Sequence, residues 1–269
     1  MATKLPAFLT HLSNLAANGT GTITTTSDTS AYPIANITGL PISKAWRSAT
    51  GVISNVDILI DFGSAQSINL LALINHNLTS TATIAVAAGT TTGVSNYSTT
   101  ISYRQYDAFT YLSAAQSYRY WRIRITDSSS TDNFIEAGYL IAASATKLAS
   151  TFQYGWTQAD NFVNNAVTSE FGVPYIDELY YQQEFNFTFA NKSQTEVNVM
   201  RTIFQAVKRN VTPIFFIPDT GTNDGYFGRF QNSFVQTVGV PASAGQGTNL
   251  ITLATLNFLE DSRGRKIAA

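Results

Sequence analysis

Short apolar runs separated by turn-forming residues fill the chain between residues 21 and 143. These runs are TITTTS, VDILIDF, INLLALIN, TATIAVAA, FTYLS, YRYWRIRIT and FIEAGYLIA. Gly, Ser, Thr, Asn and Asp stand between them, and no long helical period runs through the region. Frequent short strands with such turns are typical of an all-β sandwich or barrel. We therefore predict a mainly β fold.

The run YRYWRIRITD alternates strictly in residue type. Trp121 and the two isoleucines share one parity, whereas Arg122 and Arg124 share the other. Successive side chains of a strand point to opposite faces, so the tryptophan and the isoleucines should enter a core. We predict that the two arginines lie on the outer face, where they form a docking face for a neighbouring subunit or a ligand site.

The residue composition and the apolar-polar alternation of the sequence change near Leu148. Small polar residues dominate there and the alternation lapses, which divides the chain into residues 1–148 and residues 149–269. Beyond the boundary, ELYYQQEFNFTFA alternates as a long half-buried strand, and IFFIPD, YFGRF and NLITLATLNFLE follow as further strands. We predict an α+β barrel or sandwich with one packed helix.

That helix is predicted at about residues 193–210, in SQTEVNVMRTIFQAVKRN. Ser193 and Glu196 have the spacing of a capping box at its start. An apolar stripe for packing is formed by Met200, Ile203, Phe204 and Val207.

The composition narrows the function classes. Charged residues make up 12% of the chain, about half of the ~25% usual in globular proteins. With a net charge of −1 and no basic run, the chain lacks the signature of a nucleic-acid binder. The chain has no cysteine, and no signal peptide or membrane-spanning helix is expected. Weak electrostatic repulsion suits a protein that packs permanently against copies of itself, although a secreted binding module can look the same.

No catalytic motif stands out in the sequence. His11 and His76 are the only histidines, and neither has a metal-ligand partner four residues away, so we predict structural roles for both. The loops TDSSSTDN and DTGTNDG hold oxygen ligands for calcium, but they lack the spacing of an EF-hand and consist of ordinary turn residues. Asp57 and Asp61 share one parity of a strand, and glycoside hydrolases use paired carboxylates at a fixed distance. We predict no enzyme activity, no cofactor and no metal, and keep a glycoside hydrolase as the third alternative.

Three segments of the first half form a set: SAYPIANITGLPISKAWRSA, VDILIDFGSAQSINLLALIN and YRYWRIRITD. Together they resemble the discoidin-like (F5/8 type C) jelly roll. The resemblance implies a β-sandwich that holds its ligands in end loops. Trp46 directly precedes Arg47 in a loop-like part of the first segment, and an aromatic ring there can stack on a sugar, so both residues are candidates for ligand or docking contacts. The alternative, which we favour for Trp46, is a tryptophan that plugs the end of the sandwich. The chain lacks the flanking cysteines of the extracellular members.

The pieces of the second half follow one another as ELYYQQEFNFTFA, the helix, IFFIPD, YFGRF and ITLATLNFLED. In this order they resemble the ring-forming barrel of tailed-phage tail proteins, of the tail-tube and distal-tail (hub) type. The resemblance implies that sheets pair edge to edge between subunits in a hexamer or trimer. Arg201 and Arg229 are candidates for the subunit interface, and solvated surface arginines are the alternative for both.

These observations predict a non-enzymatic structural protein of the virion, in a phage tail near its tip or baseplate. The C-terminal domain would form the ring, and the N-terminal domain would decorate it. The expected partners are further copies of the chain, the tail tube, hub and fibres, and host-surface glycans, with no nucleic acid and no membrane insertion. The alternative is a discoidin-type carbohydrate-binding module protein without a virion role.

Overall fold

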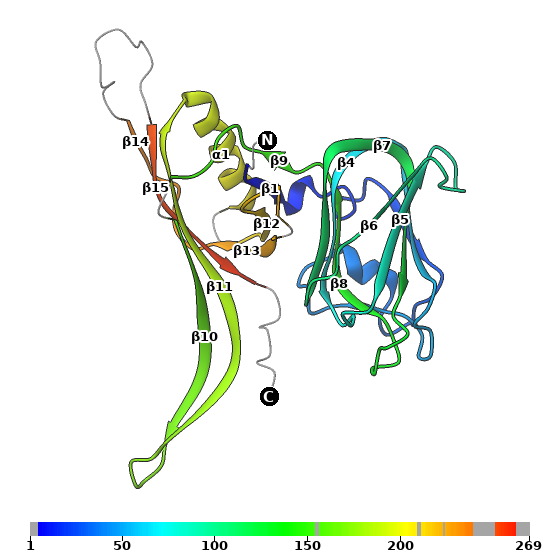
Figure 1. The fold of residues 1–269 in the computed structure, drawn as a ribbon, viewed down its shortest axis with the longest axis horizontal. Coiled ribbons are helices and arrows are strands. Elements are labelled where there is room, and N and C mark those ends of the chain that lie inside the picture. The colour runs from blue at the N-terminus through cyan, green and yellow to red at the C-terminus, as the bar shows by residue number, and fades with distance from the viewer. Residues whose placement is uncertain (1–4, 154–155, 209–210, 223, 239–250, 262–269) are drawn as a thin grey trace.

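A computed structural model describes residues 5–153, 156–208, 211–222, 224–238 and 251–261. The fold is mainly β, as predicted. It consists of two antiparallel sheets, the helix α1 (Gln194–Val207) and the short 3-10 helices His11–Ser13 and Ile34–Thr38. The two sheets lie side by side in Figure 1, and a long ribbon of two strands protrudes from one of them.

The first sheet folds into a two-layer β-sandwich. Its strands are β2 (Thr22–Thr25), β3 (Trp46–Arg47), β4 (Val56–His76), β5 (Thr83–Gly89), β6 (Tyr97–Thr100), β7 (Asp107–Thr126) and β8 (Glu136–Ala143). They follow the order β3-β8-β4-β7-β5-β6, and β2 pairs with β4.

Strands β4 and β7 contribute to both layers of the sandwich. They pair along their length with register shifts, and the pair arches over one end of the sandwich (Figure 1). Gly63 lies in the first of these interruptions and adopts a φ of 73°, which other residues rarely reach. The first half of β4 lies beside β2 and the second half lies beside β8. The runs VDILIDF and INLLALIN are therefore two halves of one bent strand.

The apolar parity of β7 fills the sandwich interior, as predicted. Trp121, Ile123 and Ile125 have no exposed surface, and they belong to the same cluster as Leu71 and Leu73 of the second half of β4. Residues from both layers therefore form one continuous core.

The second sheet carries the helix. Its strands are β1 (Ala7–Thr10), β9 (Thr146–Lys147), β10 (Thr157–Thr168), β11 (Pro174–Lys192), β12 (Ile214–Ile217), β13 (Tyr226–Phe230), β14 (Gln236–Val238) and β15 (Ile251–Glu260). Their order is β10-β11-β15-β13-β12-β1-β9, with β14 paired to β15. Over the described residues this path has two ends, so the unit predicted as a barrel is an open sheet with one helix packed on it.

The helix α1 begins as predicted and ends slightly early. The Glu196 backbone N–H donates to Ser193 Oγ, and the Ser193 backbone N–H donates to the Glu196 carboxylate, which completes the capping box. Lys208 then adopts left-handed angles (φ 48°, ψ 48°) and terminates the helix after Val207. Residues 209–210, which the prediction included, lie outside the described residues.

The N-terminal strand belongs to the second sheet. Strand β1 pairs with β12, where Ala7 lies opposite Ile217, and also with β9. The predicted boundary at Leu148 had left β1 in the same domain as the sandwich. Sheet pairing between such distant segments depends on the assembled fold, and local patterns do not reveal it.

An apolar interface joins the sandwich to the second sheet. The Phe109 and Phe215 rings lie 5.3 Å apart between centroids, and the Tyr139 and Phe227 rings lie 5.6 Å apart. Strand β8 and the second half of β4 therefore have one face in the sandwich core and the other in this interface. This double burial explains why INLLALIN is apolar on both parities.

Candidate functional sites

Trp46 is a core residue at the edge of the sandwich. Its side chain has no exposed surface, and its indole N–H donates to the carbonyl of Ser27 over 3.2 Å. A ligand cannot reach this ring, so the prediction of Trp46 as a ligand contact is corrected.

Arg47, the neighbouring candidate, lies in a partly exposed cluster. Its guanidinium forms an ion pair with Glu136 and lies 4.1 Å from the ring centroid of Tyr32 and 4.7 Å from that of Phe134. The side chain of Arg47 remains 31% exposed, and Tyr32 is 38% exposed. We call these four residues the Tyr32 cluster. It presents the Tyr32 ring and the Arg47 guanidinium at the rim of the sandwich, whereas Glu136 is buried.

Arg122 and Arg124 lie on strand β7 at the parity opposite to the core, as predicted. Arg124, however, finds its acceptor within the chain: Nε and Nη2 each donate to the Asp57 carboxylate over 2.7 Å. Arg119 binds Asp61 in the same bidentate way, and this hydrogen bonding lowers the pKa of Asp61 to about 2. The two carboxylates considered for acid-base chemistry are therefore partners of arginines.

Arg122 borders an open groove of about 510 Å³ on the outer face of β5, β6 and β7. Besides Arg122 and Arg124, its lining consists of Ala85, Val86, Ala87, Ser98, Thr99 and Thr100. The lining side chains on β5 and β6 are mostly short, and the Arg122 side chain is partly exposed. This groove is the part of the predicted docking face that intrachain pairing does not occupy.

The two arginines predicted at a subunit interface make contacts within the chain. Arg201 donates to the side-chain oxygen of Gln236, and Arg229 forms an ion pair with Asp261. Burial raises the pKa of Asp261, and Arg229 opposes this effect. A role for either arginine between subunits stays a prediction.

The most exposed element is a two-stranded ribbon, which we call the arm: residues 161–182 of β10 and β11 with their turn. Strand β11 pairs with both β10 and β15 between Glu184 and Asn186, but below residue 184 it pairs with β10 alone. The other edge of β10 has no neighbour among the described strands. Figure 1 shows the arm extending away from the rest of the molecule.

The arm carries an unusual share of exposed apolar side chains. Six of the thirteen large exposed hydrophobic residues in the described chain lie on it: Phe162, Val167, Phe171, Val173, Tyr175 and Ile176. Soluble proteins rarely leave such a patch, or so long an open strand edge, without a partner. The arm is therefore a candidate for an interaction surface.

Phe171 occupies the tip of the arm and is 92% exposed. The turn that presents it is defined by hydrogen bonds from the Gly172 backbone to the Ser169 carbonyl (2.9 Å) and from the Val173 backbone to Ser169 Oγ (3.1 Å). Gly172 adopts a φ of 76°, which favours glycine. The sequence reasoning missed this feature, although VTSEFGVPYI combines a turn-forming glycine with apolar residues in a polar stretch.

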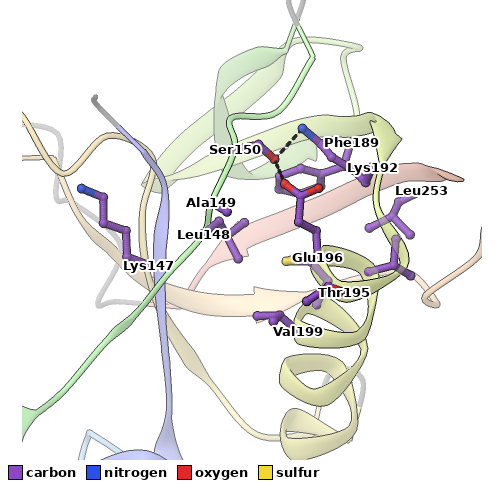
Figure 2. A pocket seen from close by; sticks show the side chains of 12 residues that line it. Lys147, Leu148, Ala149, Ser150, Phe189, Lys192, Thr195, Glu196, Val199 and Leu253 are labelled. Carbon is purple, nitrogen blue, oxygen red and sulfur yellow. Dashed lines mark hydrogen bonds between the residues drawn. The ribbon is translucent and has the colours of Figure 1, made fainter. Parts of the chain in front are cut away.

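A pocket of about 140 Å³ lies beside the N-terminal half of α1 (Figure 2). Buried apolar residues from the linker after β9, from β11, from α1 and from β15 contribute to its walls: Leu148, Phe189, Val197, Met200 and Leu253. We call it the helix pocket. Its volume and lining suit one apolar group.

Polar residues hold one side of the helix pocket in place. Lys192 Nζ donates to Ser150 Oγ and to the Thr151 carbonyl, each over 2.7 Å, and Ser150 Oγ donates to the Glu196 carboxylate (Figure 2). Burial lowers the pKa of Lys192, and the charge of Glu196 opposes this. Burial alone would raise the pKa of Glu196, but the hydrogen bonds from Ser150 and Ser193 and the charge of Lys192 lower it. The network ties the linker to the helix.

The described residues contain no group of three or more histidine or acidic side chains arranged for a metal ion. Within the same residues, no helix is long and apolar enough to span a membrane. His76 is buried, and its Nδ1 accepts the Leu78 backbone N–H over 3.2 Å, which is a structural contact.

Comparisons with known proteins give a limited result. No protein family and no curated protein matches the chain. Similar solved structures include a family 32 carbohydrate-binding module from Clostridium perfringens NanJ in complex with galactose, with 10% identity and a TM-score of 0.39, covering 52% of this chain and 100% of that one. Another is chitosan-binding module 2 of a Paenibacillus chitosanase/glucanase in complex with chitotriose, with 20% identity and a TM-score of 0.40, covering 49% and 100%. Each likeness therefore extends over about half of this chain.

Proposed function

We propose that this chain is a non-enzymatic structural protein that assembles into a closed ring of identical subunits through the arm. The observation that carries the proposal is the arm itself. It combines a strand edge that has no neighbour among the described strands with six exposed apolar side chains. Pairing of β10 with a strand of a neighbouring copy would satisfy its backbone groups and cover this surface. Closure of the ring would leave no further edge for uncontrolled growth.

The sandwich would then lie on the outside of the ring and contact surface carbohydrates. Two of the similar solved structures are carbohydrate-binding modules, one in complex with galactose and one in complex with chitotriose. In this chain, the Tyr32 cluster offers an exposed ring and the partly exposed guanidinium of Arg47 at the sandwich rim. Aromatic rings and charged hydrogen-bonding groups are suited to sugar binding.

The proposed location is the tail of a phage particle, near its tip or baseplate. The order of the strand and helix segments in residues 149–269 resembles the tail-tube and distal-tail type, and low charge suits permanent packing between subunits. Purified particles that contain this chain in a symmetric tail density would support the location. The chain's presence as a free, dispersed protein would contradict it.

The assembly proposal is tested by removing the arm. Asn161 and Gln182 are directly paired, so residues 162–181 can be replaced by an Asn-Gly turn between them. We expect native mass spectrometry to give a discrete oligomer for the full chain and a monomer for this variant. Because the removed residues lie outside the described apolar clusters, its melting temperature should stay within about 5 °C. A full chain that stays monomeric at high micromolar concentration would refute the proposal.

Carbohydrate binding without assembly is the second candidate, favoured by the Tyr32 cluster. The test is a glycan array with the full chain and with Tyr32→Ala, with the exposed Tyr175→Ala on the arm as the matched control. Binding that requires Tyr32 in a monomeric protein would favour this candidate over the ring. No binding by the full chain would remove it.

A further inference from the structure

The helix pocket is an apolar counterpart to the tip of the arm. Phe171 at the arm tip is the most exposed large hydrophobic residue of the described chain, and the pocket is lined by apolar residues. We infer that Phe171 of one copy inserts into the helix pocket of the next copy, and this inference rests on the proposed assembly through the arm. It specifies the contact that the assembly proposal leaves open.

The size of the pocket fits a phenyl ring. The pocket measures about 140 Å³. Apolar protein cavities of about 150 Å³ take up benzene, which is the ring of a phenylalanine side chain. Phe189, Met200 and Leu253 of the lining would surround the ring, and all three are almost fully buried already.

The charges around the two surfaces are complementary. Glu170 directly precedes Phe171 and is exposed at the tip. The residues bordering the pocket include Lys147 and Lys192, against one carboxylate, Glu196, that is already bonded to Ser150 and Ser193. The lining thus carries one more positive than negative charge, which favours the approach of Glu170. The Lys147 side chain points away from the other lining residues (Figure 2), so its charge acts from the border of the pocket.

The contact must form between two copies of the chain. Strand β11 starts at Pro174, next to the tip, and ends at Lys192, next to the pocket. Its 19 residues span roughly 60 Å when extended, and Figure 1 shows the tip and α1 at opposite ends of this strand. Phe171, which we call the knob, and the helix pocket lie on different parts of the surface of one copy, so the contact between copies is head-to-tail. Such a contact closes into a ring when the rotation between copies allows it.

Two variants separate the knob from the pocket. Phe171→Ser removes the knob and leaves the pocket intact. Ala149→Trp places a large ring at an exposed position of the pocket lining and blocks it while the knob remains. We expect each variant alone to associate roughly 10-fold to 100-fold more weakly than the unchanged chain, the ratio that corresponds to exposing one phenylalanine side chain. Phe162→Ser, which removes another exposed phenylalanine from the arm, is the matched control and should retain more of the association.

Mixing the two variants gives the decisive readout. The Ala149→Trp chain still offers a knob, and the Phe171→Ser chain still offers a pocket, so native mass spectrometry should detect a one-to-one dimer that does not grow further. Absence of this dimer, or a Phe171→Ser chain that assembles like the unchanged chain, would overturn the inference while leaving assembly through the arm intact. An unchanged chain that is monomeric would instead refute the assembly proposal. Equal losses for Phe162→Ser and Phe171→Ser would also overturn the inference, because they would show a general apolar contact.

Discussion

At the scale of single residues, the outward arginines of β7 show how far a sequence pattern reaches. The alternation around Trp121 predicts correctly that Arg124 leaves the core. It does not identify the partner, because that depends on the register between β4 and β7. The observed register sets Asp57 directly opposite Arg124, so the charge is satisfied within the chain. The parity of a residue can be inferred locally, whereas its cross-strand neighbour cannot.

His76 makes the stability of the fold sensitive to acid. Burial lowers the pKa of His76 from 6.5 to about 4, and this effect exceeds the opposing contributions of the Arg104 backbone and the Asp127 charge. Between these two values the unfolded chain binds the proton and the folded chain does not. The free energy of unfolding should therefore fall by roughly 3 kcal/mol as the pH is lowered from 6.5 to 4. Urea titrations across this pH range measure the fall.

The His76→Gln variant is the control for this pH dependence. It should lose most of the slope between pH 6.5 and pH 4, even if its stability at pH 7 is lower. Burial also lowers the pKa of His11, so a smaller slope of the same sign should remain. An unchanged slope in His76→Gln would show that other groups cause the acid sensitivity.

At the scale of elements, locally encoded features were predictable and features that depend on distant pairing were not. The start of α1 follows from Ser193 and Glu196, which lie three residues apart. Neither the placement of β1 beside β12 nor the bend in β4 follows from local patterns, because both depend on partners far away in the chain. The arm was missed for a related reason. Its strands look like any others in the sequence. Only the sheet order shows that β10 has one neighbour among the described strands and that β11 pairs with β10 alone below residue 184.

The capping box of α1 should contribute measurably to stability. In Ser193→Ala the Glu196 backbone N–H loses its acceptor and the carboxylate of Glu196 loses one of its donors. We expect a loss of about 1 kcal/mol in the free energy of unfolding, measured by denaturant titration. Thr195→Ala, an exposed substitution in the same helical turn, should change it by no more than about 0.5 kcal/mol. Equal effects of the two substitutions would contradict the role of the cap.

At the scale of the whole molecule, the sandwich and the second sheet share structure in two ways. The apolar interface buries the outward face of β8 against β12 and β13, and β1 and β9 come from the chain segments on either side of the sandwich. The division into residues 1–148 and 149–269 stays a prediction about domains. The pairing of β1 with β12 implies that cutting the chain at Leu148 would remove an inner strand from the second sheet.

This shared structure predicts that the two sheets unfold together. The Phe8 ring stacks 4.9 Å from Phe216 in the core of the second sheet, so Phe8→Ala should cost about 3 to 5 kcal/mol there. In a Trp156→Phe background the remaining tryptophans, Trp46 and Trp121, lie in the sandwich core and report on the sandwich alone. If the molecule is one cooperative unit, Phe8→Ala shifts the fluorescence transition of these tryptophans as far as the far-UV circular dichroism transition.

The exposed substitution Val235→Ala is the control, and by either signal it should change the free energy of unfolding by no more than about 0.5 kcal/mol. A fluorescence midpoint that stays in place while the dichroism midpoint moves would show that the sandwich unfolds independently. The reason is that interface contacts which couple the two sheets must pass the loss of stability in the second sheet on to the sandwich.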